Sequence, residues 1–177
     1  MTTYKFLARG GRGPFSGNAW PLPAGDAPGA WIEVVGPLAP CARGVHVCRA
    51  FELAHWLHDE LWQVDTDGNR LEMPDCMVVQ RARLLRRIDS WSSGGAARFA
   101  EACIGHAVAL AGSAPGAAVR EFLDDAKLAA SAGYVAVAAF TSAFAVAKLD
   151  AGHEDAGAYR RERAWQSDWI ARELIAA

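Results

Sequence analysis

The residue pattern changes character near residue 90, and this change constrains the fold more than any other feature of the sequence. Before it, short runs of alternating apolar and polar residues are separated by Gly- and Pro-rich stretches such as residues 10–17. After it, apolar residues recur at helical spacing in four successive stretches. Because alternation is typical of strands and a spacing of three to four residues is typical of helices, the sequence predicts an α+β protein. We expect a small, mostly antiparallel sheet with one short helix, packed against a four-helix unit.

The first part of the chain, residues 1–90, is predicted to be rich in β-structure. The expected strands are residues 2–9, 31–35, 44–48 and 77–88, with a short helix at residues 50–60. Asp67 and Gly68 stand between two further apolar runs, residues 61–65 and 70–73. An Asp-Gly pair between such runs is a strong hairpin signal, so we expect a turn at residues 66–69.

The second part, residues 91–177, is predicted to be helical, and the two parts are expected to form one compact unit. The expected helices are residues 96–110, 116–130, 133–149 and 154–175. Residues 128–147 form an uncharged run of 20 residues, which is long enough to cross a bilayer. Since this run is mostly Ala with few strongly apolar side chains, it predicts a central helix buried by its neighbours rather than a membrane span.

Composition excludes some classes of protein. The formal net charge is −2, which lacks the basic excess expected of a nucleic-acid binder. The four cysteines lack the regular spacing of a disulfide framework, so we expect their thiols to be reduced. No secretory signal is visible at the N-terminus, so we expect a cytoplasmic protein. The basic residues are 15 Arg and 3 Lys, and with the heavy use of Ala and Gly they suggest a GC-rich bacterial genome.

Groups that can perform chemistry are densest in residues 40–62. If residues 44–48 form a strand, Val45 and Val47 point into a core, and His46 and Cys48 share the opposite face. Arg43 and Arg49 flank them, and a cation near a thiol favours its thiolate. One hypothesis is therefore a catalytic pair, in which Cys48 or Cys41 is the nucleophile and His46 the proton partner.

Three alternatives stay open for this stretch. A metal could be bound by the Cys and His side chains, although Cys-x4-His-x-Cys is not a standard zinc spacing. A non-covalent pocket could hold an anionic or aromatic ligand. Cys48 could also be a small buried hydrophobe beside a hydrogen-bonded His46. The metal ligands would be Cys41, His46, Cys48, His55 and His58; the pocket would use Cys41, Arg43, Arg49 and His55, with Arg81 and Arg83 as an anion-receiving wall.

No nucleotide or metal cofactor is expected. A glycine-rich loop after a strand, residues 10–17, invites comparison with a phosphate-binding loop. That loop requires Gly-Lys-Ser/Thr leading into a helix, and here Pro14, Pro21 and Pro23 oppose a helix.

Three helical segments, residues 99–110, 132–140 and 162–169, resemble an all-helical family of bacterial immunity proteins. The shared features are an Ala-rich central helix and a terminal helix with Glu-Arg-x-Trp-Gln, and the resemblance covers about residues 96–175. The chain has Tyr134 and Phe140 in the central helix, where the family has histidines. The resemblance implies a non-catalytic, protein-binding role. Any property of the family that depends on those histidines is not expected in this chain.

Two functions are therefore predicted. The first is a protein that binds, and can transform, a small molecule without a cofactor, in a cleft between the sheet and the helices. The second is a non-catalytic immunity-type or protein-interaction module. The partner is accordingly a small molecule or another protein, with no nucleic acid and no membrane.

Overall fold

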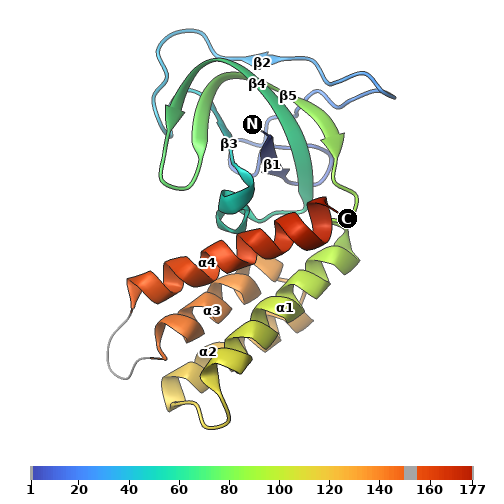
Figure 1. Ribbon diagram of the computed structural model, residues 1–177. Coiled ribbons are helices and arrows are strands. Elements are labelled where there is room, and N and C mark those ends of the chain that lie inside the picture. The colour runs from blue at the N-terminus through green and yellow to red at the C-terminus, as the bar shows by residue number, and fades with distance from the viewer. Residues whose placement is uncertain (1, 150–154, 177) are drawn as a thin grey trace. The chain divides into compact units, whose positions relative to one another are not determined.

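The computed structural model describes residues 2–149 and 155–176, and the chain divides into two compact units, Met1–Ser92 and Ser93–Ala177 (Figure 1). The first, the β unit, holds a mixed set of short and long strands with one short helix. The second, the helical unit, consists of α-helices. The structure thus confirms the predicted α+β class.

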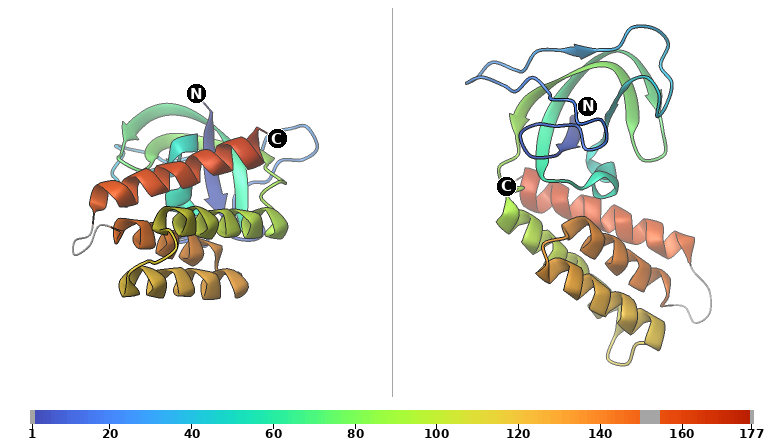
Figure 2. Two further views of the ribbon diagram at one scale, coloured as in Figure 1. Left: turned by 60° about the horizontal axis from the view of Figure 1, so that its bottom comes forward. Right: turned by 180° about the vertical axis from the view of Figure 1, so that it is seen from behind.

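The β unit is built on one antiparallel sheet in the order β1-β4-β5-β2, with β3 also paired to β5. Its elements are β1 (Thr3–Leu7), β2 (Ile32–Glu33), β3 (Val45–Val47), a 3₁₀ helix η1 (Ala50–Trp56), β4 (Glu60–Glu72) and β5 (Met77–Arg87). Figures 1 and 2 show that β4 and β5 are strongly curved. Tyr4 on β1 and Cys48, just after β3, exchange two backbone hydrogen bonds of 2.8 Å, so the curvature brings the edge strand β1 back beside β3.

The predicted hairpin at residues 66–69 is wrong. These residues lie inside β4, and the chain turns between Glu72 and Met77 instead, where Met73 N donates to Cys76 O at 2.9 Å. Gly68 has φ +80°, and the register with β5 shifts between Asp67 and Arg70. Asp-Gly therefore supplies a bulge that bends the strand, because a glycine with positive φ suits one type of bulge as well as a hairpin turn.

Alternation along the strands explains the core of the β unit. Side chains from every strand and from the loop that follows β1 converge on one apolar cluster; its buried members are Leu7, Trp20, Val45, Val47, Trp62, Val64, Met77, Val79, Ala82 and Leu84. The predicted helix at residues 50–60 is present as the shorter η1. Glu52, the third residue of η1, accepts a hydrogen bond of 2.7 Å from the backbone N of Arg49, which caps the helix start.

The helical unit contains all four predicted helices, with small shifts at their ends. They are α1 (Ser93–Ala111), α2 (Ala117–Ser131), α3 (Val135–Ala147) and α4 (Ala156–Ile170), and α4 continues into a π-helical turn, η2 (Ala171–Ile175). The predicted start of the last helix, residue 154, lies outside the described residues. The Ala-rich α3 contacts α1, α2 and α4, because fully buried Ala138, Ala139 and Ala143 allow close approach. Among the described residues, no helix is long and apolar enough to cross a membrane.

Candidate functional site

Strand β3 places its side chains on two faces, as the sequence predicts. Val45 and Val47 belong to the apolar core of the β unit. His46 and Cys48 lie outside this cluster and line, together with Val47, a small cavity of about 20 Å³, here called the Cys48 cavity. Its lining residues are Tyr4, Lys5, Phe6, His46, Val47, Cys48 and Trp56. This volume accommodates about one water molecule.

The Cys48 thiol is almost wholly protonated at neutral pH, which makes it a weak nucleophile there. Cys48 is 2% exposed, and its Sγ donates a hydrogen bond to Tyr4 O at 3.4 Å. Burial raises the pKa of Cys48 to about 12, although the nearby Lys5 ammonium opposes this rise. Because only the thiolate is a strong nucleophile, the arrangement favours the structural interpretation of Cys48 over the catalytic one.

His46 uses one ring nitrogen to hold the preceding loop. Its Nε2 lies 3.4 Å from the backbone N of Cys41, which donates to it. Cys41 is exposed and has φ +61°, a conformation that few residues other than glycine adopt. Burial, followed by the Lys5 charge, lowers the pKa of His46, so the neutral ring that can accept this bond is favoured.

Lys5 is a charged group at the Cys48 cavity that the pattern analysis missed. Its Nζ donates to His46 O at 2.7 Å and lies 5.4 Å from the centre of the Trp20 ring. The Lys5 side chain thus adds a further hydrogen bond between β1 and β3, next to the backbone hydrogen bonds between Tyr4 and Cys48. Burial lowers the pKa of Lys5 to about 8. A lysine in the middle of an otherwise apolar strand, residues 3–7, is the sequence signal that could have revealed it.

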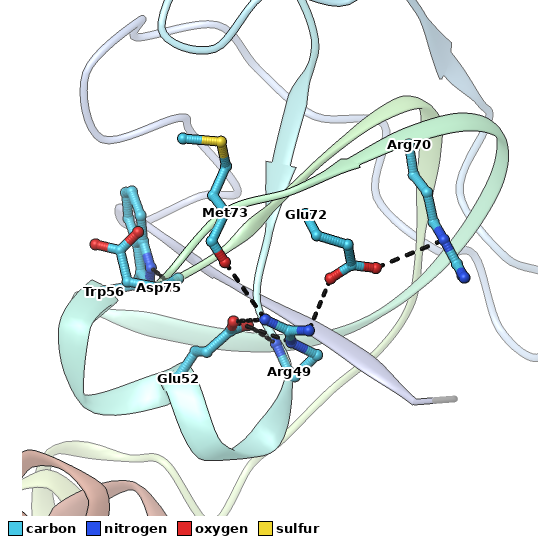
Figure 3. A network of polar contacts seen from close by, with 7 residues as sticks. All are labelled: Arg49, Glu52, Trp56, Arg70, Glu72, Met73 and Asp75. Atoms are coloured by element: carbon cyan, nitrogen blue, oxygen red, sulfur yellow. Dashed lines mark hydrogen bonds and ion pairs between the residues drawn. The ribbon is translucent and has the colours of Figure 1, made fainter.

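Arg49 is committed to an ion-pair network rather than to the Cys48 thiol (Figure 3). Its guanidinium pairs with Glu52 and, at 2.7 Å, with Glu72 Oε2, and it also contacts Met73 O at 3.5 Å. The same group lies 4.5 Å from the centre of the Phe51 ring. The network therefore ties η1 to the turn between β4 and β5, and sequence reasoning did not identify either glutamate.

Arg81 and Arg83 form a ladder with acidic and aromatic groups on the sheet. Arg81 pairs with Asp67, and Arg83 donates to Asp65 Oδ2 at 2.8 and 3.0 Å. The two guanidinium groups lie 4.8 and 4.5 Å from the centre of the Trp31 ring. Although β5 does neighbour β3, the pairing uses residues 77–79, whereas Arg81 lies opposite β2. Both arginines thus already have carboxylate partners and do not join the Cys48 cavity.

The remaining predicted ligand groups also lie away from the Cys48 cavity. Arg43 is exposed in the loop before β3, and His55 is exposed on η1. His58 follows the end of η1, so it is not on a shared helical face with His55. Within residues 2–149 and 155–176, no group of three His, Cys, Asp or Glu side chains is arranged to hold a metal ion.

A larger hollow, here called the Arg70 pocket, lies on the sheet of the β unit. Its volume is about 320 Å³, and its lining residues are Thr3, Val64, Asp65, Thr66, Arg70, Met77 and Val79. Val64, Met77 and Val79 belong to the buried core and are at most 3% exposed, so the accessible surface of the pocket is mainly polar. Because side chains alternate along a strand and cross-strand partners share a face, Thr66 lies on the face of Val64, and Arg70 on that of Val79.

Arg70 is the cationic group of this pocket and is weakly held. Its side chain is 64% exposed, and its Nε lies 3.6 Å from Glu72 Oε1, which is longer than a hydrogen bond. Glu72 in turn pairs with Arg49 (Figure 3). Thr3 contributes a hydroxyl that donates to Val64 O at 2.7 Å. The pocket therefore combines an exposed cation, the Asp65 carboxylate and hydroxyl groups.

The helical unit holds a buried carboxylate–imidazole pair. Glu162 Oε2 on α4 lies 2.9 Å from His106 Nδ1 on α1, and the imidazole stacks on Trp165 with ring centres 3.9 Å apart. Burial raises the pKa of Glu162, and the His106 charge opposes this rise. The pair ties α1 to α4, next to Gln166, which donates to Ala139 O at 2.8 Å.

Searches of protein families, curated proteins and solved structures found no match to this chain. The resemblance of the helical segments to immunity proteins therefore stays a prediction.

Proposed function

We propose that this protein binds a small carboxylate-bearing molecule in the Arg70 pocket and forms no covalent bond to that molecule. The observation that carries the proposal is the difference in volume between the two hollows of the β unit. The Arg70 pocket measures about 320 Å³, whereas the Cys48 cavity measures about 20 Å³. Ligand pockets usually span about 300–1,000 Å³, so only the former can hold an organic molecule.

The groups around the pocket support the choice of ligand. A guanidinium recognises a carboxylate through paired N–H donors. Arg70 forms an ion pair with Glu72 at 3.6 Å, which is longer than a hydrogen bond, and its side chain is 64% exposed, so its donors have room for a second carboxylate. The Thr66 hydroxyl can add a further hydrogen bond, and the nearly buried Val64, Met77 and Val79 leave only a small apolar contact. The ligand is thus a compact monoanion.

The test is a titration of the full chain with a panel of short aliphatic and aromatic monocarboxylates and their neutral primary amides. Amide chemical shifts in NMR spectra report where each compound binds, and we expect changes at Thr66, Arg70 and Val79 for the acids alone. Arg70→Gln should weaken binding at least about tenfold, since one charge-assisted hydrogen bond contributes about 1.5–3 kcal/mol.

Arg43→Gln is the matched control, because Arg43 is an exposed arginine of the β unit that does not line the pocket. It should leave binding unchanged. Equal binding of acids and amides, or equal losses in Arg70→Gln and Arg43→Gln, would contradict the proposal.

A second function, a protein-interaction module of the immunity type, is favoured by exposed apolar side chains on the helical unit. They are Leu128, Tyr134, Val137 and Phe140, each at least 47% exposed. A photo-crosslinking amino acid in place of Val137 would separate the two functions. A protein crosslinked at residue 137 but not at exposed Glu121 would favour this second function, and no such product would exclude it.

A further inference from the structure

Cys48 and Cys76 occupy facing positions at one end of the sheet. The antiparallel pairing of β3 with β5 ends at Val47 opposite Met77. Extending this register by one residue on each strand places Cys48 opposite Cys76. Because directly opposed residues of an antiparallel pair have side chains on the same face, the two thiols lie side by side.

The backbone hydrogen bonds indicate whether Cys48 and Cys76 form a hydrogen-bonded or a non-hydrogen-bonded pair of the antiparallel strands. Both the N–H and the C=O of Cys48 bond to Tyr4 on β1, so neither group points toward Cys76. Cys76 O accepts from Met73 N across the turn, so it also points away from β3. Positions of this kind are non-hydrogen-bonded pairs, with Cα atoms about 4.5 Å apart. That separation falls within the range of about 4.4–6.8 Å that a disulfide spans.

The surroundings agree with this proximity. Cys48 and Cys76 are 2% and 4% exposed, and the charge of a Cys76 thiolate would oppose ionisation of Cys48. Burial raises the pKa of Cys48 to about 12 and that of Cys76 to about 11. The Lys5 ammonium lies close enough to both to be affected by their charge. The Cys48 cavity, about 20 Å³ in volume, admits only a molecule close to the size of water.

We propose that Cys48 and Cys76 are a dithiol that a small peroxide oxidises to a disulfide between the end of β3 and the start of β5. One thiolate attacks a peroxide oxygen, the O–O bond breaks, and the sulfur becomes a sulfenic acid while the departing hydroxide takes up a proton to form water. The second thiol attacks the sulfenic sulfur, the S–O bond breaks, and a second water leaves. Two thiols are thereby oxidised, and one hydrogen peroxide is reduced to two waters.

The experiment exposes the folded, reduced full chain to hydrogen peroxide, blocks remaining thiols with an alkylating agent and analyses tryptic peptides by mass spectrometry. Cleavage after arginine places Cys48 in residues 44–49 and Cys76 in residues 71–81. The expected product is these two peptides joined, with the loss of two hydrogens, and reversed by dithiothreitol. The rate should rise about tenfold for each pH unit from about pH 7 to 9, because the thiolate fraction does.

Matched variants decide between this pair and other oxidation products. Cys48→Ser and Cys76→Ser should each abolish the crosslink, whereas Cys41→Ser and Cys103→Ser should form it at the wild-type rate. Unchanged circular dichroism before and after peroxide establishes that the folded chain reacted. A bridge that contains Cys41, or sulfenic and sulfinic acids with no bridge at all, would overturn the proposal.

Discussion

Replacing Glu52 tests whether the Arg49 network supports the β unit through its buried carboxylate. The Glu52 side chain is 2% exposed and accepts from the Arg49 backbone N at 2.7 Å and from Arg49 Nε at 2.9 Å. Removing one partner of a buried ion pair typically costs about 3–5 kcal/mol, because the other charge is left without compensation. Here Arg49 keeps Glu72 as a partner at 2.7 Å, so we expect the lower end of that range, about 3 kcal/mol, for Glu52→Ala.

The assay is urea denaturation followed by tryptophan fluorescence. With a slope of about 2 kcal/mol per molar urea, the midpoint should fall by about 1.5 M. Hydrogen exchange in η1, Ala50–Trp56, should accelerate as well, because Glu52 caps this helix. Glu72→Ala is the matched control: it also removes a carboxylate from Arg49, but the Glu72 side chain is 48% exposed, so the loss should stay below about 1 kcal/mol. Equal midpoints for the two variants would refute the reasoning from burial.

Two further predictions concern Lys5 and the helical core. Burial lowers the pKa of Lys5 from 10.5 to about 8, so the folded state releases this proton first, and Lys5 should add about 1 kcal/mol to the free energy of unfolding between about pH 8 and 9. The thiols of the unfolded chain ionise in the same range and lower the free energy of unfolding, because burial raises the pKa of Cys48 and Cys76 in the folded state. In urea titrations, the change in the free energy of unfolding between the two pH values should be about 1 kcal/mol more positive in the wild type than in Lys5→Met; equal changes in the two proteins would contradict the assignment to Lys5. In α2, Leu123 is buried among small side chains that cannot close a cavity, so Leu123→Ala should cost about 2–4 kcal/mol by thermal or urea denaturation. Leu128→Ala, the same change at a 69% exposed position of the same helix, should cost less than about 0.5 kcal/mol, and comparable losses would contradict the assigned core.

The secondary structure was largely predictable because it depends on local periodicity. The strands at Thr3–Leu7, Val45–Val47 and Met77–Arg87 and the helices α1 to α4 each follow a repeat that can be read within a single segment. The exception, Gly68, shows the limit of that rule. A positive φ suits both a hairpin turn and a bulge, and the choice depended on the pairing of Asp67 with Arg81 across β4 and β5.

The candidate site was predictable only in part, because residue types do not report their partners. Strand alternation correctly separated His46 and Cys48 from the valines of β3. Arg49, however, pairs with Glu52 and Glu72 rather than activating a thiol. The second of these glutamates is far away in the sequence, so this partner could not be identified from spacing.

What the sequence by itself determined is therefore the α+β class, the place of most helices and strands and the faces of β3, since each follows from neighbours along the chain. Only the tertiary structure decided that Cys48 is a buried thiol, that Lys5 binds a β3 carbonyl, and that Arg70 borders the larger pocket. These features depend on the curvature of β4 and β5, which brings β1 back beside β3. Burial and proximity created in this way set the pKa values and the ligand volume, and neither can be obtained from local pattern.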